Sequence, residues 1–137
     1  MKLILGLGNP GPRYHNTRHN LGYLCLDEWS RARKRAFQTD KLYDYISIKD
    51  AVLIKPTTWM NLSGEAARAA TRRWDISESL VVYDDLELPL ASLRVRGGGG
   101  DGGHNGMKSL FEVLPADDLK RLRLGIGKDQ SVDAADY

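Results

Sequence analysis

The sequence has little of several features that assign a chain to a special class of protein. Its one cysteine, Cys25, has no second cysteine with which to form a disulfide. Its longest apolar stretches are a few residues, whereas a helix needs about 20 to cross a bilayer. The apolar stretch after Lys2 is also too short for a signal peptide. These absences predict a cytoplasmic protein without disulfides or membrane spans.

Neither sign of charge dominates, because 20 Lys and Arg stand against 18 Asp and Glu, and net charge alone therefore identifies no partner. What the chain does have is 42% hydrophobic and 28% charged residues in 137 positions, a composition typical of a soluble domain with a core. We expect residues 1–137 to form a single domain. Residues 131–137 end without a cap or closing element, so either the protein is short or a further part is missing.

Strand and helix patterns alternate along the whole chain. The strands are expected at 2–7, 42–48, 51–54, 80–83, 93–96 and 122–126, and the helices at 21–32, 63–74 and 107–114. Residues 42–54 resemble an antiparallel hairpin, whereas the other strands alternate with helices. This mixture predicts an α/β fold with one twisted mixed β-sheet and helices on both of its faces.

A glycine-rich turn after the first strand, residues 6–11, matches G-x-G-x-x-G, which suggests dinucleotide binding. In that motif a helix begins at once and presents its N–H groups to a pyrophosphate. Here Pro10 and Pro12 interrupt the turn, and helical periodicity begins only at Leu21. No acidic residue closes a second strand at the usual spacing. The turn alone therefore gives little support for nicotinamide or flavin binding.

Polar side chains able to do chemistry fall at the ends of several expected elements, where sites assemble in open α/β sheets. Each could have a local role, since Asn and Asp are common in turns and helix caps. Their occurrence together favours a common site. They are Asn9, His19, Asn61, Asp84, His104 and Asn105.

A histidine and an aspartate on neighbouring elements can act as a catalytic pair, because the carboxylate fixes the imidazole tautomer and stabilises the imidazolium. No serine or cysteine stands in a nucleophile motif, so water would be the attacking group. Only three histidines and one cysteine are present, without zinc-ligand spacing. We expect neither a metal nor a cofactor.

Six ordered sequence blocks and Tyr14 resemble the signature of bacterial peptidyl-tRNA hydrolases, from the first residues to about Gly127. Such an ordered set is far more specific than any one block. Members of that family usually continue with C-terminal helices, which this chain is expected to lack. The blocks are LGLGNPG (5–11), TRHN (17–20), KPTTWMNLSG (55–64), DDLELP (84–89), GGHNG (102–106) and RLRLGIG (121–127).

The resemblance implies hydrolysis of the ester that joins a peptide, or an N-blocked amino acid, to the 3′ ribose of tRNA. It implies that His19 is the general base, that Asp84 orients His19, and that Asn9 holds His19 and the ester in register. This activity would recycle peptidyl-tRNA during translation and ribosome rescue. We expect a monomer that acts on the acceptor stem and 3′ end of peptidyl-tRNA.

The remaining site residues also follow from the resemblance. Asn61 and Asn105 would bind the peptide main chain or the polarised carbonyl, since an amide N–H suits developing oxyanion charge. Met60 would line the peptide channel, Tyr14 would support the site, and His104 would flank the nucleotide. Tyr14 and Met60 are equally compatible with packing.

Basic residues near the glycine-rich loop and the last strand could contact phosphates of the acceptor stem. By resemblance, Arg96 and Arg123 match positions that clamp phosphate; the alternative is solvated surface charge. Asp101 departs from the pattern, because the family often has His or a small residue there, and an acid could repel phosphate.

Two other functions remain open. One is a non-catalytic RNA-binding relative of the intron-splicing type, which would have no need of the His–Asp pair. The other is a nucleotide-binding module built on the glycine turn.

Overall fold

The structure is a computed structural model that describes residues 1–14, 17, 20–85, 93–97, 100–101, 103–114 and 119–125, and of residues 93–97 only the backbone. His19, for which the sequence predicts the role of general base, lies outside the described residues. So do the side chain of Arg96 and the chain end, residues 126–137.

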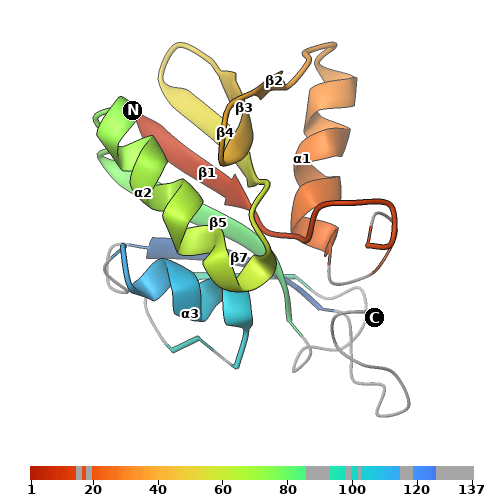
Figure 1. Cartoon of the computed structure of the whole chain (residues 1–137), viewed down its shortest axis with the longest axis vertical. Helices are drawn as coiled ribbons and strands as arrows, with labels where there is room; N and C mark the ends of the chain where they lie inside the picture. The colour runs from red at the N-terminus through yellow and green to blue at the C-terminus, as the bar shows by residue number, and fades with distance from the viewer. Residues whose placement is uncertain are drawn as a thin grey trace.

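The described strands are interspersed with helices along the chain (Figure 1). In chain order they are β1 (Lys2–Gly6), α1 (Leu21–Ala32), β2 (Gln38–Thr39), β3 (Tyr43–Ser47), β4 (Ala51–Pro56), the 3₁₀ helix η2 (Met60–Leu62), α2 (Ser63–Arg73), β5 (Glu78–Asp85), β6 (Leu93–Gly97), α3 (Asn105–Phe111) and β7 (Leu119–Gly125).

The strands form one mixed sheet in the order β2-β3-β4-β1-β5-β7-β6. Strand β1 pairs in parallel with β4 on one side and β5 on the other, and β5 pairs in parallel with β7. Strands β2, β3 and β6 are antiparallel additions at the two edges. The predicted α/β fold with a mixed sheet is therefore confirmed. Because the central strands are parallel, their carboxyl ends meet at a single edge of the sheet.

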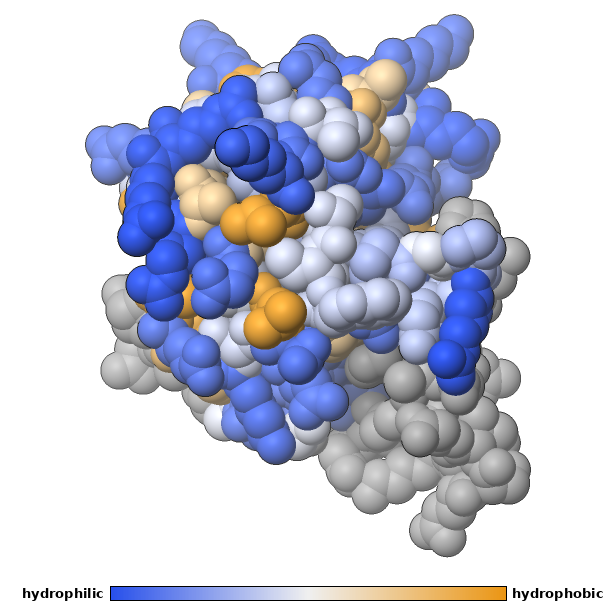
Figure 2. Space-filling view, in the orientation of Figure 1, coloured by the Kyte–Doolittle hydropathy of each residue, from blue (hydrophilic) through white to orange (hydrophobic). Residues whose placement is uncertain are grey.

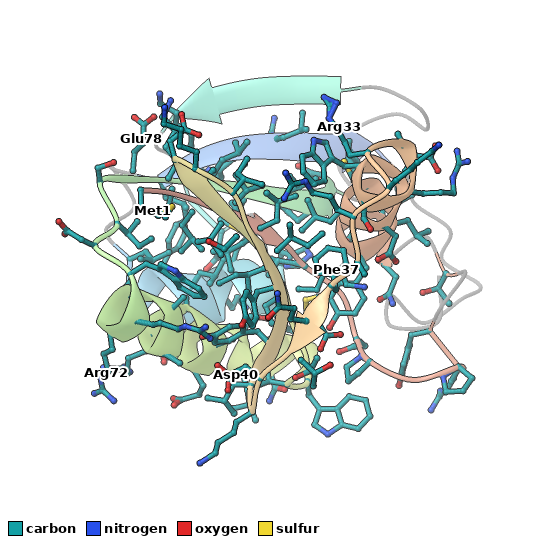
Figure 3. The ribbon with its side chains drawn as sticks, turned by 90° about the horizontal axis from the view of Figure 1, so that it is seen from above. Met1, Arg33, Phe37, Asp40, Arg72 and Glu78 are labelled. Atoms are coloured by element: carbon teal, nitrogen blue, oxygen red, sulfur yellow. The ribbon has the colours of Figure 1, made fainter. Side chains whose placement is uncertain are left out.

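Helices cover both faces of the sheet, as predicted (Figures 1 and 3). The alternation of side chains along each central strand explains this arrangement. Leu3 and Leu5 of β1 belong to the larger core with α2 and α3, whereas Ile4 packs in the smaller core with Leu26 of α1 and Leu53 of β4. A strand with apolar residues on both faces reads as a continuous hydrophobic run, which is why the sequence predicted a buried strand here.

The coloured part of the face seen in Figure 2 is mainly polar. In the view of Figure 2, small hydrophobic patches are separated by hydrophilic side chains, and in Figure 3 Arg72 points away from the sheet. Among the residues that the structure describes, no helix has both the length and the apolar character needed to span a membrane.

Two short elements were not predicted from the sequence, because they have no periodicity of their own. Strand β2 consists of Gln38 and Thr39, both exposed, and is held by pairing with β3. The 3₁₀ helix η2 lies between β4 and α2. The last strand also begins earlier than expected, at Leu119, which is 1% exposed and pairs with Ser79.

Close contact between α1 and the sheet depends on Gly22. A Cβ atom there would lie 2.4 Å from the Val82 carbonyl oxygen and 2.5 Å from the backbone nitrogen and oxygen of Leu7. These neighbours are backbone atoms of β5 and of the residue after β1, so they cannot move aside as a flexible side chain could. The helix therefore begins directly against the strand ends, next to the loop that carries His19.

We expect Gly22→Ala to lower the free energy of unfolding by about 1–3 kcal/mol through overpacking. Alanine is intrinsically the better helix residue by about 1 kcal/mol, so propensity alone predicts the opposite sign. Urea denaturation measures the change. The matched variant is Ala32→Gly, at the exposed end of the same helix, where glycine should be the destabilising residue. A Gly22→Ala protein more stable than the wild type would contradict the close contact.

Candidate functional site

The carboxyl edge of the parallel strands gathers several of the predicted polar residues. Asn9 follows β1 and is 7% exposed, and Asp84, near the end of the adjacent β5, is 1% exposed. His104 and Asn105 reach the same region at the start of α3. A carboxylate buried this deeply is stabilised only by polar partners.

Asn9 is held in a network of buried hydrogen bonds. Its backbone N–H donates to Oδ1 of Asn20, and Nδ2 of Asn20 donates back to the Asn9 carbonyl, both at 2.8 Å. The side-chain oxygen of Asn9 accepts from the backbone N–H of Met60 at 2.7 Å. Asn9 therefore joins the turn after β1 to the residue that follows His19 and to the segment after β4.

Asn20 supports the site, and this role was not predicted from the sequence, where Asn20 was noted only within the TRHN block. It is 1% exposed and makes two reciprocal bonds to one backbone unit. Such pairing fixes the separation of the two ends of the loop, and a sequence pattern gives no sign of it.

The segment that carries Met60 and Asn61 is anchored at its start. The Tyr23 hydroxyl of α1 donates to the Pro56 carbonyl at the end of β4. Lys55 forms an ion pair with Asp27 at 2.5 Å and lies 4.4 Å from the centre of the Phe37 ring. Burial, followed by the charges of Asp44 and Asp27, raises the pKa of Tyr23 far above its usual value, so the hydroxyl remains a donor at neutral pH.

Next to this anchor is an open pocket of about 520 Å³ that adjoins Asn9. Its lining combines the turn after β1 with charged groups from α1, β3 and β4. The lining residues are Asn9, Pro10, Gly11, Pro12, Tyr23, Asp27, Asp44, Lys55 and Thr57.

His104 contacts Asp84, with 3.0 Å between Nε2 and Oδ1. Its other ring nitrogen, Nδ1, accepts from the backbone N–H groups of Gly106 and Met107 and so caps the start of α3. A nitrogen that accepts cannot carry a proton, so the neutral ring has its proton on Nε2 and donates it to the carboxylate. The Tyr83 ring meets the imidazole edge-on, with 5.0 Å between ring centres.

The sequence predicted His19 as the partner of Asp84. This pairing stays a prediction, because His19 lies outside the described residues. The structure adds a contact between Asp84 and His104. From the sequence, His104 was expected only to flank the nucleotide. The helix-cap alternative for Asn105 is wrong, since His104 is the N-cap and Asn105 is the first residue of α3.

The other predicted residues differ in exposure. Asn61 and Asn105 are exposed. Met60 is 4% exposed, and its sulfur lies 2.7 Å from where a Cβ of Gly106 would be, so the Met60 side chain of η2 packs against α3. Tyr14 makes an edge-on contact with Trp59, with ring centres 6.2 Å apart. Trp59 is 55% exposed, and its place beside the site was not apparent from the sequence.

The two predicted phosphate-binding arginines lie on the paired strands β6 and β7. Arg123 forms an ion pair with Asp85 at 3.3 Å, its side chain is 18% exposed, and its Nε has no hydrogen-bond partner. For Arg96 the structure gives only the backbone position, opposite Arg121 in the β6–β7 register. Within the described ranges no three His, Cys, Asp or Glu side chains gather closely enough to hold a metal ion.

We expect Asn20→Ala to lower the free energy of unfolding by about 1–3 kcal/mol, because it leaves the buried N–H and carbonyl of Asn9 without partners. Denaturant unfolding followed by tryptophan fluorescence measures the loss. The control is Asn61→Ala, an exposed amide in the adjacent segment, for which we expect no more than about 0.5 kcal/mol. Equal stability of the two variants would contradict a structural role for the Asn9–Asn20 pair.

Comparison with known proteins agrees with this geometry. The sequence profile of the family described as peptidyl-tRNA hydrolase matches residues 3–137. The peptidyl-tRNA hydrolase of Pseudothermotoga lettingae is 43% identical over an alignment that covers 100% of this chain and 75% of the relative. That of Exiguobacterium sibiricum is 46% identical over 93% of this chain and 73% of the relative.

A crystal structure of peptidyl-tRNA hydrolase from Acinetobacter baumannii superposes with a TM-score of 0.85 at 32% identity. The superposition covers 95% of this chain and 70% of that one. Sequence and fold thus agree over nearly the whole chain, which belongs to the peptidyl-tRNA hydrolase family.

Proposed function

We propose that this protein hydrolyses the ester bond between a peptide, or an N-blocked amino acid, and the 3′ ribose of tRNA, and so recycles peptidyl-tRNA for translation. The observation that carries the proposal is the cluster of Asn9, Asp84 and His104 at one edge of the sheet, in a chain whose family match spans residues 3–137. The cluster provides a buried carboxylate beside amide and imidazole groups.

In the proposed reaction His19 takes a proton from water, and the water oxygen attacks the ester carbonyl carbon. The bond between that carbon and the ribose oxygen then breaks, and the ribose oxygen takes up the proton from His19. The products are tRNA with its ribose hydroxyl restored and the free carboxyl group of the peptide, which releases the second proton of the water to solvent at neutral pH. The proposed reaction uses no metal or cofactor.

Asp84 would stabilise the imidazolium that forms on His19. The contact from His104 supports an ionised carboxylate, because an Nε2–H donor stabilises the charged form of its acceptor. Asn9 would act mainly through position, since its side-chain oxygen is already bonded to Met60. The exposed amides of Asn61 and Asn105 are suited to donate to the peptide main chain or to the developing oxyanion.

The RNA part of the substrate would be the acceptor stem and 3′ end, held by Arg96 and Arg123. Arg123 is partly exposed at its side chain, and its pairing with Asp85 fixes its direction. Contacts to phosphate carry no base sequence, so a single enzyme could act on many tRNAs. We further propose that the protein works in the cytoplasm as a monomer.

The activity is tested by release of an N-blocked amino acid from its tRNA, with unblocked aminoacyl-tRNA as control substrate. We expect cleavage of the blocked ester only. His19→Ala should lower kcat by about 10²–10⁴-fold, the usual contribution of a general base, and leave tRNA affinity unchanged. Asp84→Asn should also lower kcat, since it removes the charge that stabilises the imidazolium.

A fully active His19→Ala protein would contradict the assigned base. Binding of tRNA without any cleavage by the wild-type chain would instead favour the non-catalytic RNA-binding alternative.

Arg123→Ala should weaken tRNA binding and reduce the slope of log K against log salt by about one unit, as expected when one phosphate contact is lost. Fluorescence anisotropy across a salt series measures both quantities. Lys120→Ala is the matched control, because Lys120 is a cation on the same strand that pairs with Glu78 at the other end of the sheet. If the two variants bind alike, Arg123 makes no specific phosphate contact.

A further inference from the structure

Arg121 is a buried cation whose place in the core is not explained by packing. It lies on β7, is 3% exposed, and has no carboxylate within ion-pair distance among the described residues. Its Nε has no hydrogen-bond partner. Burial of a charge without a counter-ion is unfavourable, and an apolar side chain of similar volume is often at least as stable in such a place.

The contacts of Arg121 lead toward the site. Its guanidinium donates to the carbonyl of Gly100 and lies 3.5 Å from the hydroxyl of Tyr83, while its flat face lies over the Phe111 ring at 5.7 Å. Gly100 comes just before the turn that leads into α3, and Tyr83 comes just before Asp84 on β5. One side chain therefore joins both segments that meet at the contact between Asp84 and His104.

The turn after Gly100 is tied directly to His104. The carbonyl of Asp101 accepts from the His104 backbone N–H at 3.0 Å, and Oδ1 of Asp101 accepts from the Gly103 N–H at 2.8 Å. The imidazole then rests edge-on against Tyr83. A shift of Gly100 or of Tyr83 would move the ring that donates to Asp84.

We propose that Arg121 is a positioning residue: by binding Gly100 and Tyr83 together it fixes the imidazole of His104 in the orientation that donates Nε2–H to Asp84. The proposal rests on the proposed hydrolase function only for its kinetic consequence. Its structural consequence, a single placement of the His104 ring against Asp84, stands independently of what the protein catalyses.

The decisive variant is Arg121→Met, which keeps an unbranched side chain over Phe111 and removes the charge and the donors. We expect an unchanged or higher melting temperature and a kcat about 10- to 100-fold lower, the size of effect that follows from slight misplacement of a site. KM should change little, because Arg121 is buried. A purely structural role predicts the opposite pattern, a lower melting temperature with normal kcat in the folded fraction.

Two further variants serve as controls. Lys120→Met removes a neighbouring cation that is exposed on the same strand, and should leave kcat and KM as in the wild type. Arg121→Lys keeps the charge, but the lysine side chain is shorter and its ammonium group stops short of the position of Nη1, which contacts both Gly100 and Tyr83, so kcat should be recovered only in part.

The second readout is the ¹⁵N NMR spectrum of the imidazoles, with the His104 signals assigned by their loss in His104→Gln. In both the wild type and Arg121→Met the His104 ring should be protonated at Nε2, because Gly106 and Met107 still donate to Nδ1. In Arg121→Met the Nε2 signal should shift or broaden, because the bond to Asp84 is no longer held in one geometry. Because this spectrum needs no substrate, it tests the positioning role even if the wild-type chain does not hydrolyse peptidyl-tRNA.

Wild-type kcat together with an unchanged His104 spectrum in Arg121→Met would overturn the proposal. Should Arg121→Met fail to fold, Arg121→Lys is judged in its place. A lysine variant with wild-type kcat and spectrum would overturn the proposal equally, whereas a lowered kcat with a shifted or broadened Nε2 signal of His104 would support it.

Discussion

The parallel pairing of β1 with β4 and β5 is the constraint on which the rest of the structure depends. It sends the carboxyl ends of three strands to the same edge of the sheet, so that Asn9, the segment leading to Met60, and Asp84 converge although they are far apart in sequence. Hydrophobic burial on both faces of β1 holds that pairing, with Leu3 and Leu5 fully buried on one side and Ile4 packed on the other. The apolar packing of β1 thus fixes where the polar residues at the carboxyl ends of the strands lie.

Several polar groups at this edge are paired with partners from other elements. Asn20 binds Asn9 across the first loop, Asn9 binds Met60 after β4, and His104 joins the start of α3 to Asp84 at the end of β5. Buried polar groups cost free energy unless they are paired, so such a network tolerates few alternative arrangements. The same bonds that stabilise the loops therefore set the positions of the groups proposed to do the chemistry. Arg121, a charge placed where an apolar residue would pack, is proposed to position these groups indirectly, through Gly100 and Tyr83.

Much of the fold followed from local patterns. Apolar runs ended by glycine or proline predicted β1 and β4, helical spacing predicted α1 and α2 nearly to the residue, and the pattern of residues 42–54 indicated the hairpin between β3 and β4. Strand β2 and helix η2 were missed, because two- and three-residue elements are held by tertiary pairing and have no period to detect. The candidate site was predicted as a set of residue types at strand ends, supported by the resemblance to a family. The role of Asn20 and the contact between Asp84 and His104 could not be predicted, because each depends on the distance between side chains from different elements.

The sequence by itself determined the periodicities, the turn residues and the ordered motifs, and with them the α/β class and the family, because these depend on residue order and local backbone preference. Only the tertiary structure decided which polar group meets which. The neutral tautomer of His104 follows from two helix N–H groups that donate to Nδ1. The role proposed for the buried guanidinium of Arg121 follows from its contacts with Gly100 and Tyr83. Hydrogen bonds are short-ranged and directional, so their partners are fixed only when packing has brought distant segments to within about 3 Å.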